Sequence, residues 1–216
     1  MPYQAVLFDL DGTLLDTLAD LGNAMNRVLA ARSLPVHPLE AYRYFVGEGA
    51  RLLVTRTLPE NRRDEATIEA CLAEFRADYD QNWQIETKPY PGVADMLDAL
   101  TARGLKLAVL SNKPHDFSQR CVRDLLPRWS FNPVLGLRET VPRKPDPAGA
   151  FEIAACLNIP PANFLYLGDT ATDMQTARAA GMFPVGALWG FRSAEELTEN
   201  GAEVLIESPL DLLKLL

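Results

Sequence analysis

Several acidic residues in this chain directly follow short apolar segments, and the first such segment is followed by two aspartates. Asp9 and Asp11 come immediately after the apolar run Ala5–Phe8, and Gly12 follows them. Residues two apart on an extended strand point to the same side, and glycine lets the chain turn sharply at once. Both carboxyl groups can therefore face one pocket.

A third aspartate, Asp169, follows the apolar run Phe164–Leu167, with Asp173 in the next helical segment. Two carboxylates about 4 Å apart repel each other by roughly 4 kcal/mol at an effective dielectric constant of about 20. If Asp9, Asp11 and Asp169 converge, a cation is needed to hold them together. Oxygen ligands without a nearby His or Cys favour Mg²⁺ over Zn²⁺.

Hydroxyl and positively charged groups follow other segments. Ser111 and Asn112 come after the apolar run Leu105–Leu110, and Lys144 precedes Pro145 in a later loop. A phosphoryl group needs a cation, a lysine, a hydroxyl and backbone N–H groups, because its charge spreads over its equatorial oxygens in the transition state. The set predicts a phosphoryl-transfer site.

Within this set, the two N-terminal aspartates have distinct expected tasks. Asp9 lies closest to the rigid strand, so we expect it to attack phosphorus and form an aspartyl-phosphate. Asp11 is the expected acid that protonates the leaving oxygen, and then the base that activates water.

Each residue also has a purely structural interpretation. The pair Asp11-Gly12 is common in turns, and acidic side chains such as Asp173 stabilise helix N-termini. Lys144 can equally be a solvated loop lysine. The occurrence of all these residues at predicted strand ends favours the catalytic interpretation.

The segments that carry these residues alternate between strand-like and helix-like patterns beyond about residue 88. The predicted strands are Ala5–Phe8, Leu105–Leu110, Val134–Leu137, Phe164–Leu167, Phe183–Leu188 and Val204–Ile206. Such alternation indicates an α/β fold with a parallel sheet covered by helices on both faces. Ligands of such sheets bind beyond the carboxyl ends of the strands, where the polar residues lie.

Residues 17 to about 85 instead contain helical patterns and no convincing strand. One predicted helical face carries Leu18, Leu21, Met25, Val28 and Leu29, and another carries Ile68, Cys71, Leu72, Phe75 and Tyr79. Thr17 and Asp20 resemble a capping box. We therefore expect a catalytic core formed by residues 1–15 and 88–216, with a helical domain inserted at 16–87.

Composition excludes several classes of protein. The chain has 216 residues, 48% hydrophobic and 23% charged, as in an ordinary globular protein. Its 21 basic and 29 acidic residues give a net charge of −8, which disfavours nucleic-acid and membrane-surface partners. With only two histidines, a His-rich metal site is excluded and a Ser-His-Asp hydrolase is disfavoured.

Location is predicted from what the sequence does not contain. No apolar stretch approaches the roughly 18 residues that cross a bilayer, and Asp9 comes too early for a signal peptide. The cysteines Cys71, Cys121 and Cys156 are widely spaced and lack metal-site spacing. We expect reduced thiols in a cytoplasmic protein, present as a monomer or homodimer.

The acidic, hydroxyl and lysine residues named above, in their order along the chain, resemble the motifs of the haloacid dehalogenase superfamily of phosphatases. The resemblance covers essentially the whole chain. The segments that resemble its four motifs are Asp9-Leu10-Asp11-Gly12-Thr13, Ser111-Asn112, Lys144-Pro145-Asp146-Pro147, and Gly168-Asp169 with Asp173. The resemblance implies a Rossmann-like parallel sheet with an inserted C1-type helical cap domain. The pattern Asp11-Gly12-Thr13 argues against a dehalogenase.

The resemblance also implies roles for individual residues. Asp9 would be nucleophile and Mg²⁺ ligand, and Asp11 would be the acid/base and give its backbone carbonyl to the metal. Asp169 would be the third protein ligand, with Asp173 supporting the metal through water. The groups expected around the phosphoryl group are Ser111, the amide of Asn112, Lys144, and Thr13 as a brace for the nucleophile loop.

Within the superfamily, phosphoglycolate phosphatases resemble the chain most closely, and a small phosphorylated metabolite is the expected partner. The stretches that carry this resemblance are Asp9–Asp16, Val46–Arg51, Ser111–Pro114 and Trp189–Phe191. In capped members a loop such as Gly47-Glu48-Gly49, followed by Arg51, faces the active site and selects the leaving group. Glu48 would repel glycolate unless it points away or pairs with Arg51 or Arg43, and the loop can also be a plain inter-helix turn.

Other interpretations remain open from the sequence. The same chemistry serves a β-phosphosugar mutase, a pyrophosphatase or a nucleotidase. A receiver-like domain would store aspartyl-phosphate as a signal, but the long helical insert argues against it. A non-catalytic interaction protein would not require Asp9, Asp11, Lys144 and Asp169 together.

Overall fold

The computed structural model describes residues 3–216, so residues 1–2 of the expected core segment 1–15 lie outside the described residues. The chain divides into two compact units, one formed by Met1–Leu15 with Pro89–Leu216 and the other by Asp16–Lys88. The chain passes between them at two short strands, β2 (Leu15–Asp16) and β3 (Lys88–Pro89), which pair with each other.

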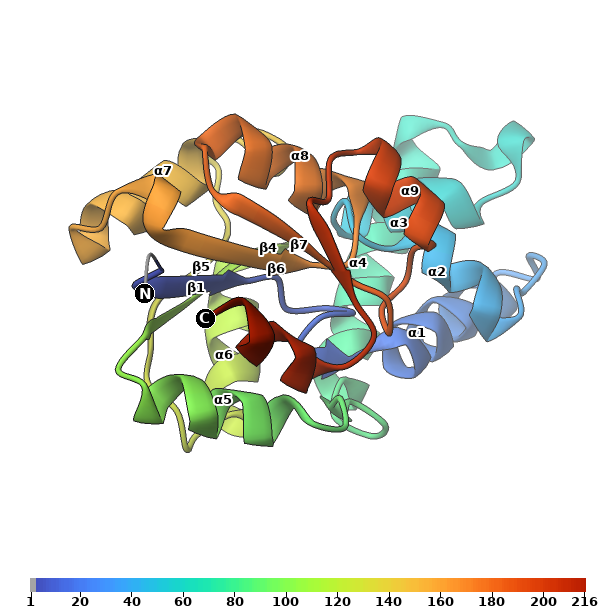
Figure 1. Cartoon of the computed structure of the whole chain (residues 1–216). Coiled ribbons are helices and arrows are strands. Elements are labelled where there is room, and N and C mark those ends of the chain that lie inside the picture. The colour runs from blue at the N-terminus through green and yellow to red at the C-terminus, as the bar shows by residue number, and fades with distance from the viewer. Residues whose placement is uncertain (1–2) are drawn as a thin grey trace. The chain divides into compact units, whose positions relative to one another are not determined.

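Six strands of the larger unit form one parallel sheet in the order β5-β4-β1-β6-β7-β8. The strands are β1 (Ala5–Phe8), β4 (Lys106–Pro114), β5 (Phe131–Leu137), β6 (Phe164–Gly168), β7 (Phe183–Ala187) and β8 (Val204–Ile206). The helices are α5 (Val93–Ala102), α6 (His115–Leu125), α7 (Ala148–Leu157), α8 (Ala171–Ala180) and α9 (Ala194–Glu199), with 3₁₀ turns at Pro161–Asn163 and Pro209–Leu215. Helices α7 and α8 cover one face of the sheet and α5 and α6 the other (Figure 1). The predicted α/β fold is confirmed.

The central strand β1 sets the position of the site. Phe8 pairs with Val109 of β4 on one side and with Leu167 of β6 on the other. From β4 the chain continues outward to β5, whereas from β6 it continues in the opposite direction to β7 and β8. Such a reversal opens a crevice at the carboxyl ends of the strands. All residues of Ala5–Phe8 are fully buried, which explains their uniformly apolar character.

Strand β4 is longer than the sequence predicts. The expected end is Leu110, but the strand runs on to Pro114, with an irregular register against β5 between these two residues. Ser111 and Lys113 therefore belong to the strand rather than to a loop. As alternate residues of an extended segment, they share one side of it.

The smaller unit is helical. Its helices are α1 (Leu18–Ala31), α2 (Tyr42–Phe45), α3 (Ala50–Thr57) and α4 (Glu65–Asn82), with 3₁₀ turns at Leu39–Ala41 and Glu60–Arg62. The predicted apolar face of α4 is fully buried, and that of α1 is buried except for the half-buried Leu18. These two faces pack against each other. No helix in residues 3–216 combines the length and apolarity needed to cross a membrane.

The predicted capping box at the start of α1 is wrong. The Thr17 hydroxyl caps no backbone N–H and has no hydrogen-bond partner. Asp20 instead accepts hydrogen bonds from the N–H groups of Glu86 and Thr87 and from the Thr87 hydroxyl, at 2.7–3.1 Å. Several donors on one buried carboxylate outweigh the single bond that a cap offers. Asp20 thus ties the last residues of the helical unit to its first helix.

Candidate active site

Asp9 is the first residue after β1, and its side chain is buried. Its N–H donates to the Leu167 carbonyl at 2.9 Å, which extends the parallel pairing by one residue. Burial raises the pKa of Asp9 well above its usual value, Lys144 opposes this rise, and Asp173 and Asp169 add to it. The carboxylate is therefore fixed at a rigid strand end among other charged groups.

The turn that follows Asp9 is built around Asp169. Gly12 has a φ of 90°, and a Cβ at this position would overlap the Asp169 carboxylate, so glycine is required for both reasons. The Thr13 hydroxyl donates to Asp169 at 2.8 Å, and the Trp189 indole N–H donates to the Thr13 carbonyl at 3.0 Å. Thr13 thus links the loop after Asp9 to Asp169 and to Trp189.

Asp169 has a hydrogen-bond donor on each carboxylate oxygen. Thr13 donates to one oxygen, and the N–H of Phe191 donates to the other at 2.8 Å. Burial raises the pKa of Asp169 to about 7, repulsion from Asp173 adds to the rise, and the two donors oppose it. The segment Trp189–Phe191 stands out in the sequence only through the family resemblance. The structure gives it a physical task, because it clamps both Thr13 and Asp169.

Lys144 is buried between two of the acids. Its Nζ donates to Asp9 at 2.8 Å, to Asp173 at 2.6 Å and to the Leu110 carbonyl at 3.0 Å. Burial opposes the charged form, but Asp173 and Asp9 outweigh it and raise the pKa of Lys144 well above its usual value. The solvated-loop interpretation of Lys144 is therefore wrong.

Asn112 holds the backbone of Lys144 with its side-chain amide. Its Oδ1 accepts the Lys144 N–H at 2.9 Å, and its Nδ2 donates to the Lys144 carbonyl at 3.2 Å. This paired contact fixes the loop that delivers the lysine to Asp9. The sequence indicates only the backbone amide of Asn112 as a site group, because side-chain partners far apart in the chain leave no pattern.

Asp173 serves the site and its helix at once. One carboxylate oxygen accepts from Lys144 and, at 3.4 Å, from the Tyr166 hydroxyl. The other accepts the N–H of Thr170 at 3.1 Å and its hydroxyl at 2.5 Å, which completes a capping box at the start of α8. The catalytic and the structural interpretations of Asp173 are thus compatible.

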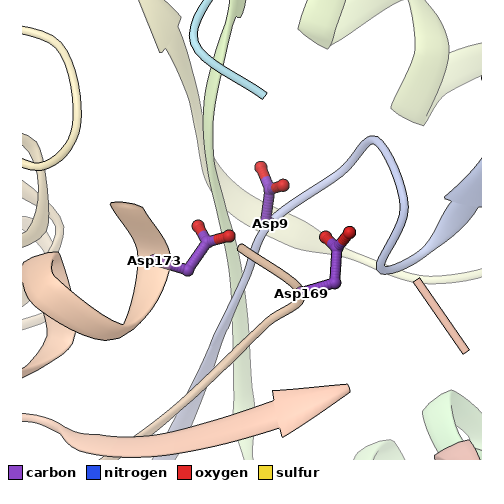
Figure 2. Close-up of side chains that lie close together, drawn as sticks. All are labelled: Asp9, Asp169 and Asp173. Atoms are coloured by element: carbon purple, nitrogen blue, oxygen red, sulfur yellow. The ribbon is translucent and has the colours of Figure 1, made fainter. Parts of the chain in front are cut away.

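Three of the acids form a cluster that suits a divalent cation. Asp9, Asp169 and Asp173 come from the end of β1, the loop after β6 and the first turn of α8 (Figure 2). Each offers a carboxylate oxygen, and these oxygens lie within 4.8 Å of one another. Carboxylate oxygens are ligands that Mg²⁺ prefers. Burial, with a smaller contribution from the neighbouring carboxylates, raises the pKa values of Asp9 and Asp169, so a cation would favour their charged forms.

Asp11 lies outside this cluster and contacts a residue that the sequence analysis does not include in the site. Both of its carboxylate oxygens accept hydrogen bonds from Lys113 Nζ, at 3.0 and 3.1 Å. The N–H of Lys113 donates to the Ser111 hydroxyl at 3.2 Å. The sequence pattern could have indicated Lys113, since it alternates with Ser111 after the same apolar run.

The Gly47-Glu48-Gly49 loop of the helical unit has a defined local structure. Gly47 and Gly49 have φ values of 109° and 92°, and α3 begins directly after Gly49. Glu48 forms an ion pair with Arg56 of α3. Arg51 and Arg43 pair with acids of their own, Arg51 with Glu65 and Glu69 and Arg43 with Glu40.

The chain is similar to known proteins over most of its length. The model of a haloacid dehalogenase-like hydrolase family matches residues 6–187. A phosphoglycolate phosphatase from Pseudomonas putida is 35% identical over 96% of this chain and 78% of its own length. A phosphoglycolate phosphatase from Xylella fastidiosa is 37% identical over 95% of this chain and 90% of its own length.

The fold is also similar to solved structures. The crystal structure of a protein from Lactobacillus delbrueckii subsp. bulgaricus superposes with a TM-score of 0.93 at 33% identity, over 100% of this chain and 98% of that one. A hydrolase from Pseudomonas syringae superposes with a TM-score of 0.78 at 26% identity, over 99% and 97% of the two chains.

Proposed function

The chain belongs to the haloacid dehalogenase-like hydrolase family, and on this premise we propose that it is a Mg²⁺-dependent phosphatase. The substrate is a small phosphomonoester, phosphoglycolate, and the reaction passes through an aspartyl-phosphate on Asp9. The observation that carries the proposal is the position of Asp9 at the carboxyl end of β1, paired with buried Lys144 and beside two further buried carboxylates.

Asp9 is the nucleophile. A carboxylate oxygen attacks phosphorus, and the bond between phosphorus and the ester oxygen breaks. Lys144 orients Asp9 and opposes the negative charge of the phosphoryl oxygens. Its three N–H groups already donate to Asp9, Asp173 and the Leu110 carbonyl. Lys144 therefore stabilises the phosphoryl group by its positive charge rather than by a direct hydrogen bond. The Ser111 hydroxyl and the Asn112 N–H donate to the phosphoryl oxygens.

Asp11 transfers the protons. Its carboxyl group gives a proton to the ester oxygen as that oxygen leaves with the bonding electrons. Asp11 then takes a proton from water, and the water oxygen attacks phosphorus. This second attack breaks the bond to Asp9, releases inorganic phosphate and restores both carboxyl groups.

The metal would be held by the carboxylates of Asp9 and Asp169 and the backbone carbonyl of Asp11, with Asp173 supporting it through water. When bound, Mg²⁺ supplies positive charge that offsets the phosphoryl oxygens in the transition state. Thr13 and the N–H of Phe191 orient Asp169 for this role.

Phosphoglycolate is favoured among small esters by the names of relatives with 31–37% identity. In this proposal the helical unit is the cap domain, and the substrate-specificity residues are Gly47, Glu48 and Gly49 of its loop, with Arg51 in the first turn of α3. The ion pair with Arg56 offsets the negative charge of Glu48, which would otherwise repel glycolate. A cytoplasmic location is part of the proposal, supported by the three free cysteines.

The test is phosphate release from a panel of small phosphate esters that includes phosphoglycolate, in Mg²⁺ and in EDTA. Mg²⁺-dependent release that is fastest from phosphoglycolate supports the whole proposal. Faster release from a sugar phosphate, a nucleotide or pyrophosphate would contradict phosphoglycolate as the substrate but would still support the phosphatase mechanism. Asp9→Asn should be inactive, while Asp95→Asn, at an exposed position of α5, serves as the matched control.

A further inference from the structure

Lys113 is a buried cation to which the mechanism above assigns no task. Its side chain is 5% exposed, and its Nζ lies 3.0 and 3.1 Å from the two oxygens of Asp11. The ring of Phe117 lies under the ammonium, at 5.3 Å from Nζ to the ring centroid. A buried ammonium has already lost most of its hydration, so an anion that reaches it can form a strong charge-assisted hydrogen bond.

The position of Lys113 relative to the reaction follows from Asp11. A general acid must lie about 2.6–3.2 Å from the atom that it protonates, here the ester oxygen of the substrate. Lys113 contacts both oxygens of that acid, so its ammonium lies beside the leaving group. In phosphoglycolate a single CH₂ separates the ester oxygen from the carboxylate. The carboxylate therefore comes within reach of Lys113 when the ester oxygen meets Asp11.

The other lysine of the site is unsuited to this task. Lys144 donates to Asp9, Asp173 and the Leu110 carbonyl, which matches the three N–H donors of an ammonium. It lies on the nucleophile side of the phosphoryl group. Lys113 lies on the side of Asp11, from which the alcohol departs.

We propose that Lys113 is a specificity-determining residue that receives the carboxylate of the substrate's leaving group beside Asp11. The inference rests on the phosphatase function proposed above and names the class of ester, one whose leaving group carries a second negative charge close to the ester oxygen. Lys113 can hold Asp11 and a ligand oxygen together, because an ammonium donates more than one hydrogen bond.

The experiment compares phosphoglycolate with its neutral amide, which has nearly the same shape. Lys113→Met should lower kcat/KM for phosphoglycolate about 10- to 100-fold more than kcat/KM for the amide, as expected for loss of one charged hydrogen bond. Lys113→Arg should restore part of the preference because it keeps the charge. Lys106→Met, an exposed lysine of the same strand, is the matched control and should leave the ratio unchanged.

Binding gives a second measurement that does not depend on the proton transfers of Asp11. In an Asp9→Asn background, calorimetry should find that Lys113→Met weakens binding of phosphoglycolate but not of the amide. Equal losses for both compounds would overturn the inference, because Lys113 would then act only by positioning Asp11. A wild-type enzyme that hydrolyses esters without preferring a carboxylate would also overturn it and leave the phosphatase intact. No phosphate release from any ester would overturn the proposed function itself, and this inference with it.

Discussion

Lys144 Nζ lies 2.6 Å from one carboxylate oxygen of Asp173, while the other oxygen of that carboxylate caps helix α8 at Thr170. One side chain thus fixes both the start of a helix and the direction of the lysine beside Asp9. The ion pair between Lys144 and Asp173 therefore contributes both to the stability of the larger unit and to the position of the charged groups in the site.

The first prediction concerns this pair. Lys144→Met should lower the free energy of unfolding by about 3–5 kcal/mol in EDTA at pH 8, because it leaves buried carboxylates without their cation. Adding Asp173→Asn should recover part of the loss, since it removes one of those charges. Urea unfolding of the two variants measures both effects. A double variant less stable than Lys144→Met alone would contradict the account.

The second prediction concerns pH in the absence of metal. Burial raises the pKa of Asp169 to about 7, so the folded state holds a proton that the unfolded state has lost above about pH 4. Stability in EDTA should therefore fall as the pH rises from about 4 to about 7, by at most about 1.4 kcal/mol per pH unit for each such proton. Asp169→Asn should flatten this slope.

The second prediction extends to Mg²⁺, because the same groups make the effect of the metal on stability depend on pH. A cation binds the ionised carboxylates, so the rise in melting temperature on adding Mg²⁺ should be larger at pH 8 than at pH 5. Thermal unfolding with and without the metal measures this. A rise that is equal at both pH values would show that binding does not involve the cluster.

Much of the site follows from the sequence because parallel strands place their carboxyl ends together. The apolar run before Asp9 and that before Asp169 pair directly through Phe8 and Leu167, so their following residues must meet. The apolar faces of α1 and α4 likewise follow from helical spacing. These features depend on backbone periodicity, which a sequence displays directly.

Side-chain partners are harder to predict because several donors compete for one acceptor. Thr17 and Asp20 have the spacing of a capping box, yet distant Glu86 and Thr87 supply better donors to Asp20. The contact between Lys113 and Asp11 depends on how far β4 extends, which its apolar run alone does not indicate. Which partner a side chain bonds to therefore depends on the complete fold, because the competing donors come from distant parts of the chain.

The third prediction concerns the brace on Asp169. Thr13→Val removes the hydroxyl that donates to this carboxylate and should weaken Mg²⁺ affinity about 10- to 100-fold, the usual effect of losing a group that orients a metal ligand. Thr57→Val is the matched control, because Thr57 is also buried but donates to a backbone carbonyl within the helical unit. Calorimetric titration with Mg²⁺ measures the affinity of each variant. Equal Mg²⁺ affinities of Thr13→Val and Thr57→Val would show that the Thr13 hydroxyl does not orient Asp169 for the metal.

The fourth prediction separates the two tasks of Asp11. Asp11→Asn should lower kcat for an alkyl phosphate about 10²- to 10⁴-fold, because the departing oxygen then lacks its proton. With p-nitrophenyl phosphate, whose leaving group needs little protonation, the variant should show a rapid burst of nitrophenol followed by slow turnover. Stopped-flow absorbance measures the burst. Unchanged steady-state turnover of both esters would contradict the role of Asp11.

The most direct test of the account is to locate the phosphoryl group on the protein. Asp11→Asn enzyme is mixed with p-nitrophenyl phosphate and Mg²⁺, quenched, reduced with borohydride and digested for mass spectrometry. Borohydride converts an aspartyl-phosphate to homoserine, and the account predicts this change at Asp9 alone, with none in Asp9→Asn. Reduction at another aspartate, or phosphate release by Asp9→Asn at the wild-type rate, would contradict it.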